Sequence, residues 1–75
     1  MPTKTEIELT KIAQEHIPDA RDVHRVQTAS GGHLYMLRMG RFGEQRPIPL
    51  AGNARASRTR LAEVILARTG RAITD

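Results

Sequence analysis

The sequence predicts an α+β fold in which a helix, three antiparallel strands and a second helix follow one another, with both helices on one face of the sheet. Apolar residues recur at helical spacing near both ends of the chain, and extended runs joined by glycine-containing turns lie between them. Residues 28–52 hold five of the six glycines and two of the four prolines, which argues against a helix there. A chain of 75 residues is expected to form one small domain over residues 1–75.

The first helix is predicted over residues 5–17. Thr5 and Glu8 form a capping-box pattern, in which the threonine oxygen accepts a backbone N–H and the glutamate reaches back to the cap. The apolar stripe of this helix consists of Leu9, Ile12, Ala13 and Ile17. Pro18 ends the helix at or before the residue that precedes it. His16 lies at the edge of the stripe, and we expect it to pack against the body of the domain.

Three strands are predicted after a turn at residues 18–22. The strands cover residues 23–29, 33–41 and 46–50. Gly31 and Gly32 join the first two strands, because glycine takes the positive φ angles of tight turns. The two faces of the second strand are almost equally apolar, so the pattern does not decide which face points inward. The third strand belongs at a sheet edge, because its two prolines cannot donate hydrogen bonds to a ladder.

The second helix is predicted to begin with Ser57 as its N-cap, or alternatively with Asn53, and to end at Gly70. Its buried stripe consists of Leu61, Val64 and Ile65, and Leu66 is the alternative fourth member. Together the elements predict one core. We expect this core to contain Leu9, Ile12, Ile17, Ile48, Leu50, Leu61 and Ile65.

The net charge of +4 is unevenly distributed along the chain. Residues 1–22 hold three cations and five carboxylates, a balance of −2, whereas residues 23–75 hold nine arginines and three carboxylates, a balance of +6. The basic part contains no lysine, and the planar guanidinium group of arginine suits phosphate better than an ammonium group. A GC-rich genome, which favours arginine codons, is the alternative explanation of the arginine excess. The separation of charge points to an anionic ligand.

The chain contains no cysteine, so neither a disulfide nor a thiolate metal site can reinforce the thin core. No apolar run approaches the roughly 18 residues that a membrane span needs. The N-terminus also lacks the apolar segment of a signal peptide. We therefore expect a cytoplasmic protein that contacts no membrane.

Arginines crowd the start of the second helix, where positive charge is unfavourable by a few tenths of a kcal/mol each. Orphan N–H groups and guanidinium groups together form an anion site. The predicted phosphate-binding residues are therefore Arg55, Arg58 and Arg60, with Arg38, Arg41 and Arg46 extending the basic surface. The alternative is a solvated helix face without a ligand.

His33 follows the glycine pair directly and is the candidate for proton transfer, because histidine titrates near neutral pH. The alternative is that it serves only the turn. His16, His24 and His33 show no short metal-ligand spacing and no carboxylate cluster completes them, so we expect neither a metal nor a small-molecule cofactor. Aromatic residues are limited to Tyr35 and Phe42, which argues against an extensive base-stacking surface.

Three segments resemble HicA-type toxins. These are the glycine–histidine segment at residues 28–35, the strand and loop at 46–53, and the closing helix at 61–70. The resemblance implies a fold similar to double-stranded-RNA-binding domains, ribosome-independent mRNA endoribonuclease activity, a HicB-like antitoxin partner and a catalytic role for His33. The chain departs from the family at two places. Gly32 stands where serine is usual, and Ala51 stands where the loop after the third strand commonly has a histidine.

Two functions of different classes follow. The first is a toxin that binds RNA through its arginines and cleaves mRNA without a metal, with His33 as general acid or base. RNA supplies its own nucleophile in the 2′-hydroxyl group next to the scissile phosphate. The second is a non-enzymatic module that binds nucleic acid or protein, such as a small phage-type regulator or inhibitor.

Overall fold

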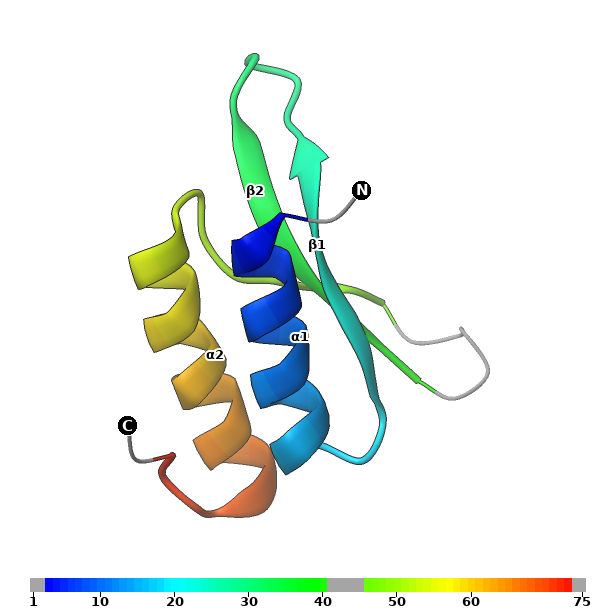
Figure 1. The fold of residues 1–75 in the computed structure, drawn as a ribbon, viewed down its shortest axis with the longest axis vertical. Helices are drawn as coiled ribbons and strands as arrows, with labels where there is room; N and C mark the ends of the chain where they lie inside the picture. Colours follow the sequence, from blue (N-terminus) through cyan, green and yellow to red (C-terminus); the bar gives the residue numbers. More distant parts are fainter. Residues whose placement is uncertain (1–2, 41–45, 74–75) are drawn as a thin grey trace.

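The computed structural model describes residues 3–40 and 46–73. The elements follow in the order α1 (Lys4–His16), β1 (Ala20–Gln27), β2 (His33–Met39), β3 (Ile48–Pro49) and α2 (Ala54–Thr69). The strands form one antiparallel sheet in the order β1-β2-β3, and the two helices lie side by side on one of its faces (Figure 1). The predicted fold class is confirmed.

The start of α1 lies earlier than the sequence pattern suggested. Thr3, not Thr5, is the N-cap, and its side chain forms the capping box with Glu6. Both threonines have a glutamate three residues later, so the pattern alone fits two frames. A tertiary contact favours the earlier frame, because Glu6 Oε2 also accepts the backbone N–H of Arg25 at 3.1 Å. At the other end, the helix ends at His16, within the predicted limit at residue 17, and Ile17 is its C-cap in an extended conformation.

The strands differ from their predicted bounds mainly at the ends. β1 begins at Ala20, so the predicted turn at 18–22 was too long; the reason is that Asp22 already pairs with Arg38 across the sheet. β2 ends at Met39, because Gly40 has a φ of 94°. Arg41, predicted as the end of this strand, lies outside the described residues.

β3 is shorter than predicted, but the pairing of its backbone continues past its last residue. The N–H of Leu50 donates to the carbonyl of Tyr35, and the N–H of Tyr35 donates to the carbonyl of Ala51, both at 2.9 Å. The inward face of β2, which the pattern left open, carries Tyr35, Leu37 and Met39, and all three are buried. β2 is the central strand of the order β1-β2-β3, and its inward face lies under the helices.

Asn53 is the N-cap of α2, and Ser57 is not. The side chain of Asn53 accepts the N–H of Ala56 at 2.8 Å, whereas Ser57 is fully buried and donates to the carbonyl of Ala51 at 2.9 Å. A serine at the first buried position of a helix thus resembles a cap in sequence. Gly70 ends the helix in the left-handed conformation, as predicted.

The predicted core is confirmed as one cluster. Leu9, Ile17, Leu61 and Ile65 are buried, and Ile12, Ile48 and Leu50 are partly buried and packed against them. Leu66, the alternative member of the stripe of α2, is exposed. His16 was expected to pack against the body, but it is exposed. It is the last residue of α1, where the chain turns into the extended cap and the side chain reaches solvent.

Candidate functional site

His33 is the first residue of β2 and stands at the end of a hairpin that projects beyond both helices (Figure 1). Its side chain is exposed. The imidazole lies edge-on to the ring of Tyr35, with 6.3 Å between the ring centroids and 88° between the planes. Because Tyr35 is buried in the core, this contact steadies a ring that otherwise faces solvent.

The turn before His33 is closed by hydrogen bonds to Thr28. The N–H of Thr28 donates to the carbonyl of Gly32 at 2.9 Å, and the N–H of Gly31 donates back to the carbonyl of Thr28 at 3.1 Å. The hydroxyl group of Thr28 also accepts the N–H of Gly32 at 3.1 Å. Gly31 has a φ of 89°, which an L side chain rarely adopts, so this glycine is required by the turn. The backbone on which His33 stands is thereby fixed.

The loop before α2 packs against the same residue. A Cβ atom added to Gly52 would come within 3.3 Å of the backbone oxygen of His33, which is closer than most real Cβ contacts. The absence of a side chain at Gly52 therefore lets the start of α2 approach the start of β2. This close contact brings the histidine and the arginine-bearing first turn of α2 to one end of the molecule.

The structure brings together two of the three arginines predicted at the start of α2. Arg55 and Arg58 are three positions apart, lie on neighbouring turns and line one hollow of about 390 Å³. Arg60 does not line it, because two positions beyond Arg58 correspond to a rotation of about 200° around the helix. Its guanidinium group contacts the carboxylate of Glu63 at 3.4 Å instead.

The other predicted arginines lie elsewhere. Arg38 is on the outer face of the sheet, opposite to the face that carries the helices, and both ends of its guanidinium group bind the carboxylate of Asp22; the Nε–Oδ1 distance is 2.6 Å. This ion pair lowers the pKa of Asp22 and raises that of Arg38. Arg46 is exposed before β3, and Arg41 lies outside the described residues.

Two residues outside the predicted site lie beside His33. Gln27 is directly opposite His33 in the β1–β2 register, and Arg25 is one step further along the same face. With Val26, the two glycines of the turn and His33, they line a hollow of about 360 Å³. The register of the hairpin, once its loop length is known, is the signal that would have placed them there.

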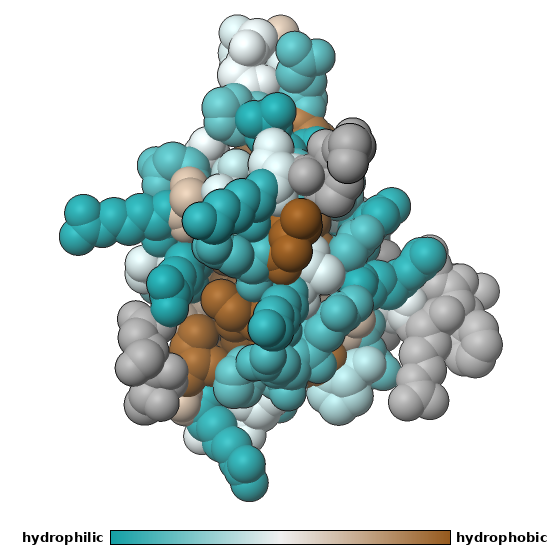
Figure 2. All heavy atoms as spheres, viewed as in Figure 1, coloured by the Kyte–Doolittle hydropathy of each residue, from teal (hydrophilic) through white to brown (hydrophobic). Residues whose placement is uncertain are grey.

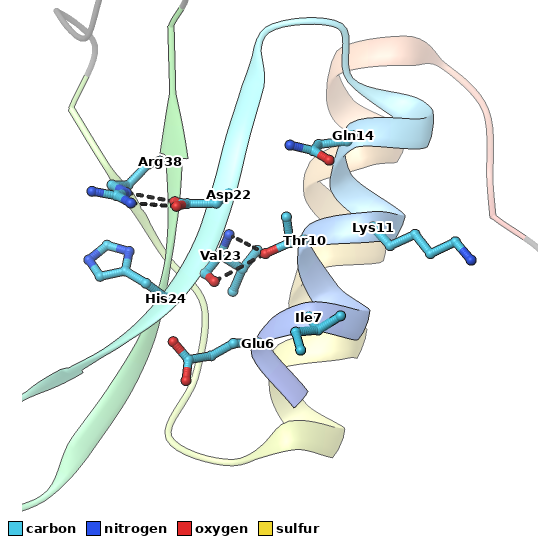
Figure 3. Close-up of a pocket in the computed structure, with 9 residues that line it drawn as sticks. All are labelled: Glu6, Ile7, Thr10, Lys11, Gln14, Asp22, Val23, His24 and Arg38. Atoms are coloured by element: carbon cyan, nitrogen blue, oxygen red, sulfur yellow. Dashed lines mark hydrogen bonds and ion pairs between the residues drawn. The ribbon is translucent and has the colours of Figure 1, made fainter. Parts of the chain in front are cut away.

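Another hollow, with a volume of about 600 Å³, lies between α1 and the edge of β1 (Figure 3). Three polar side chains of α1 in it, those of Glu6, Thr10 and Gln14, are bound to the strand. The hydroxyl group of Thr10 bonds both backbone groups of Val23, and the amide of Gln14 donates to the carbonyl of Arg21 at 2.6 Å. We therefore assign this hollow to the attachment of α1 and not to chemistry, although Nδ1 of His24 is buried there without a partner among the described residues.

Figure 2 shows that hydrophilic side chains cover most of the face that carries the two helices, with hydrophobic surface in small patches. Among residues 3–40 and 46–73, no group of three or more His, Cys, Asp or Glu side chains is arranged to hold a metal ion. Neither helix in these ranges has the length and apolar character of a membrane-spanning helix. Comparison of the chain with models of protein families, with curated proteins and with solved structures finds no significant match, and so identifies no family.

Proposed function

We propose that this protein binds RNA and acts as a HicA-like toxin, an endoribonuclease that cleaves mRNA without a metal ion and uses His33 for proton transfer. One observation carries the proposal, namely the close contact between the His33 backbone and Gly52. It joins a solvent-exposed imidazole to a helix start that carries arginines. Such a protein would be held inactive by a HicB-like antitoxin.

The start of α2 suits a phosphate group. Its first turn contains no acidic residue, so the helix itself places no carboxylate beside the N–H groups at the positive end of its dipole. Arg55 and Arg58, which line one hollow on α2, add positive charge near this helix start. Phosphates of one RNA strand bound here would pass the projecting hairpin, because the two features share one end of the molecule. Binding of this kind weakens steeply as salt rises.

The chemistry open to His33 is transfer of the RNA 2′-hydroxyl proton. The imidazole accepts that proton, the 2′ oxygen forms a bond to phosphorus, and the bond from phosphorus to the 5′ oxygen breaks. The leaving oxygen takes a proton from water, and the products are a 2′,3′-cyclic phosphate and a 5′-hydroxyl end. General acid–base catalysis of this type contributes about 10²–10⁴-fold in rate. DNA is spared because it has no 2′-hydroxyl group.

One observation favours the second candidate, a module that binds RNA or protein without cutting. HicA-type toxins commonly have a histidine where this chain has Ala51. The carbonyl of Ala51 accepts hydrogen bonds from the N–H of Tyr35 and the hydroxyl of Ser57, both at 2.9 Å, so this position is structural here. The loop that packs beside His33 thus offers no second imidazole at this position.

Incubation of the purified protein with structured and unstructured RNA separates the two candidates. The wild type should cut RNA in the presence of a chelator and leave a cyclic phosphate, and His33→Ala should bind RNA but not cut it. His16→Ala is the matched control, because His16 is also exposed but lies at the far end of α1. Equal cutting by His33→Ala and His16→Ala would overturn the mechanism. RNA binding by the wild type without any cutting would establish the second candidate.

A further inference from the structure

We propose that Arg25 holds the scissile phosphodiester of the RNA substrate against His33, with Gln27 beside it. This inference rests on the proposed function and adds a catalytic residue from β1 that none of the predicted arginines supplies. Arg55 and Arg58 then bind phosphates further along the strand, and Arg25 binds the phosphate that reacts.

The register of the hairpin places the three side chains on one face. Gln27 is opposite His33, and Arg25 is opposite Tyr35. Opposite residues of an antiparallel pair project from the same face, and diagonal neighbours lie about 7–8 Å apart. Arg25 and His33 are diagonal neighbours, so an extended guanidinium group and an imidazole can contact one phosphate group placed between them.

The hollow between these residues is open to an anion. Its volume is about 360 Å³, and the glycines at positions 31 and 32 form part of its wall without filling it. The side chains of Arg25, Gln27 and His33 are exposed, so their polar ends can reach a ligand. None of the described residues that line the hollow carries a carboxylate, so nothing in the lining repels a phosphate.

Arg25 is also held at a fixed position. Its backbone N–H donates to Glu6 Oε2 at 3.1 Å, and Oε1 of the same carboxylate accepts the N–H of Thr3 at 2.9 Å. These contacts tie the strand at Arg25 to the start of α1. The carboxylate of Glu6 also attracts the guanidinium group of Arg25. A guanidinium group has five N–H donors, so donors remain for a phosphate.

In the reaction, Arg25 donates hydrogen bonds to the non-bridging oxygens of the phosphate. Negative charge on these oxygens rises as the bond from the 2′ oxygen to phosphorus forms and the bond to the 5′ oxygen breaks. His33 takes the proton of the 2′-hydroxyl group, and water supplies the proton of the leaving oxygen. Loss of one such charge-stabilising donor typically lowers the rate about 10²–10³-fold.

The test compares Arg25→Gln with Arg21→Gln, a matched control because Arg21 is an exposed arginine on the same strand. Single-turnover cleavage of an RNA oligonucleotide should fall at least about 100-fold in Arg25→Gln and change by no more than about threefold in Arg21→Gln. Arg25→Lys, which keeps the charge but not the planar fork, should lie between them. The melting temperatures are measured alongside, and if Arg25→Gln is unfolded the comparison is made with Arg25→Lys. Cleavage by Arg25→Gln, or by Arg25→Lys in that case, at the rate of Arg21→Gln would overturn the proposal.

A second measurement separates this inference from the proposed function. A 2′-O-methyl RNA oligonucleotide cannot be cut by the 2′-oxygen route but still offers its phosphates. It should shift the NMR signals of the His33 ring in the wild type and in Arg21→Gln, and the shift should be largely lost in Arg25→Gln. If the wild type never cuts RNA, the proposed cleavage fails, while this shift still decides whether Arg25 brings a phosphate to His33. An unchanged shift in Arg25→Gln would refute the site.

Discussion

The hydroxyl group of Thr10 accepts the backbone N–H of Val23 at 2.9 Å and donates to the carbonyl of the same residue at 3.2 Å. One side chain of α1 thus binds both backbone groups of an edge-strand residue. Glu6 lies one turn before Thr10, and Gln14 lies one turn after it. They bind the neighbouring backbone groups on the same edge of β1, namely the N–H of Arg25 and the carbonyl of Arg21. The helix positions i, i+4 and i+8 match alternate residues of the strand, because both repeats are about 6–7 Å long.

Thr10→Val should therefore destabilise the fold although it keeps the shape of the side chain. Two partly buried backbone groups of Val23 lose their partner, and an unsatisfied buried group costs about 1–3 kcal/mol. Urea denaturation gives the change in the free energy of unfolding. Thr59→Val is the control, because Thr59 is exposed and bonds only its own helix backbone in the described structure; its effect should stay within about 0.5 kcal/mol. Equal midpoints for the two variants would contradict the role of Thr10.

The arrangement of the α2 arginines predicts a difference in salt dependence. Replacing both Arg55 and Arg58 with glutamine should weaken RNA binding and reduce the slope of log affinity against log salt by roughly 0.7 to 0.9 per lost phosphate contact. Arg60→Gln should change the slope little, since that arginine lies on another side of the helix and contacts Glu63. Fluorescence anisotropy at several salt concentrations measures both. A larger decrease of this slope in Arg60→Gln than in the double variant would place the RNA on the other side of α2.

The two glycines of the hairpin should respond differently to substitution. Gly31→Ala forces a side chain into the left-handed region and should cost about 1 kcal/mol or more of stability. Gly32→Ser should be tolerated within about 0.5 kcal/mol, because Gly32 has no positive φ and an added Cβ would lie 3.4 Å from the hydroxyl oxygen of Thr28. Thermal unfolding of both variants checks this. If Gly32→Ser is the more damaging change, the turn geometry described here is wrong.

The Asp22–Arg38 pair predicts a loss of stability in acid. The hydrogen bond from Arg38 lowers the pKa of Asp22, so the folded state binds a proton less readily than the unfolded state does. The contribution of the ion pair to stability is full above the ordinary carboxyl pKa of about 4, and it disappears as pH falls through the lower pKa that Asp22 has in the folded state. The wild type should have a higher melting temperature than Arg38→Gln near neutral pH, and the difference between the two melting temperatures should narrow below about pH 4. A gap that widens in acid would contradict the assignment.

The order of elements and the core could be predicted because each helix buries one regular stripe and the turns carry glycine. The helix starts could not be placed as well. Thr3 and Thr5 both fit a capping box, and the choice depends on a contact between Glu6 and Arg25 that spans 19 residues of sequence. Ser57 was mistaken for a cap because its buried hydroxyl group bonds a loop carbonyl, which the local sequence does not reveal.

The candidate site was predictable only in part for a similar reason. His33 is marked by its neighbouring glycines, and arginines near a helix start are visible in sequence. The separation of Arg60 from Arg58 also follows from helical spacing alone, but only once the helix is known to run through both. Arg25 and Gln27 join the site through the strand register, which depends on the bonds that close the turn at Thr28. Sequence patterns describe neighbours along one element better than neighbours across two.

Both borders of the sheet, as far as the structure describes them, resist the addition of a strand from another molecule. At β1 the outward backbone groups of Arg21, Val23 and Arg25 are bound by side chains of α1. At β3 the strand is two residues long and contains Pro49, which has no N–H to offer. The chain is thus guarded against the edge-to-edge association that leads to fibrils. A protein partner is therefore expected to recognise side chains and not an unpaired strand edge.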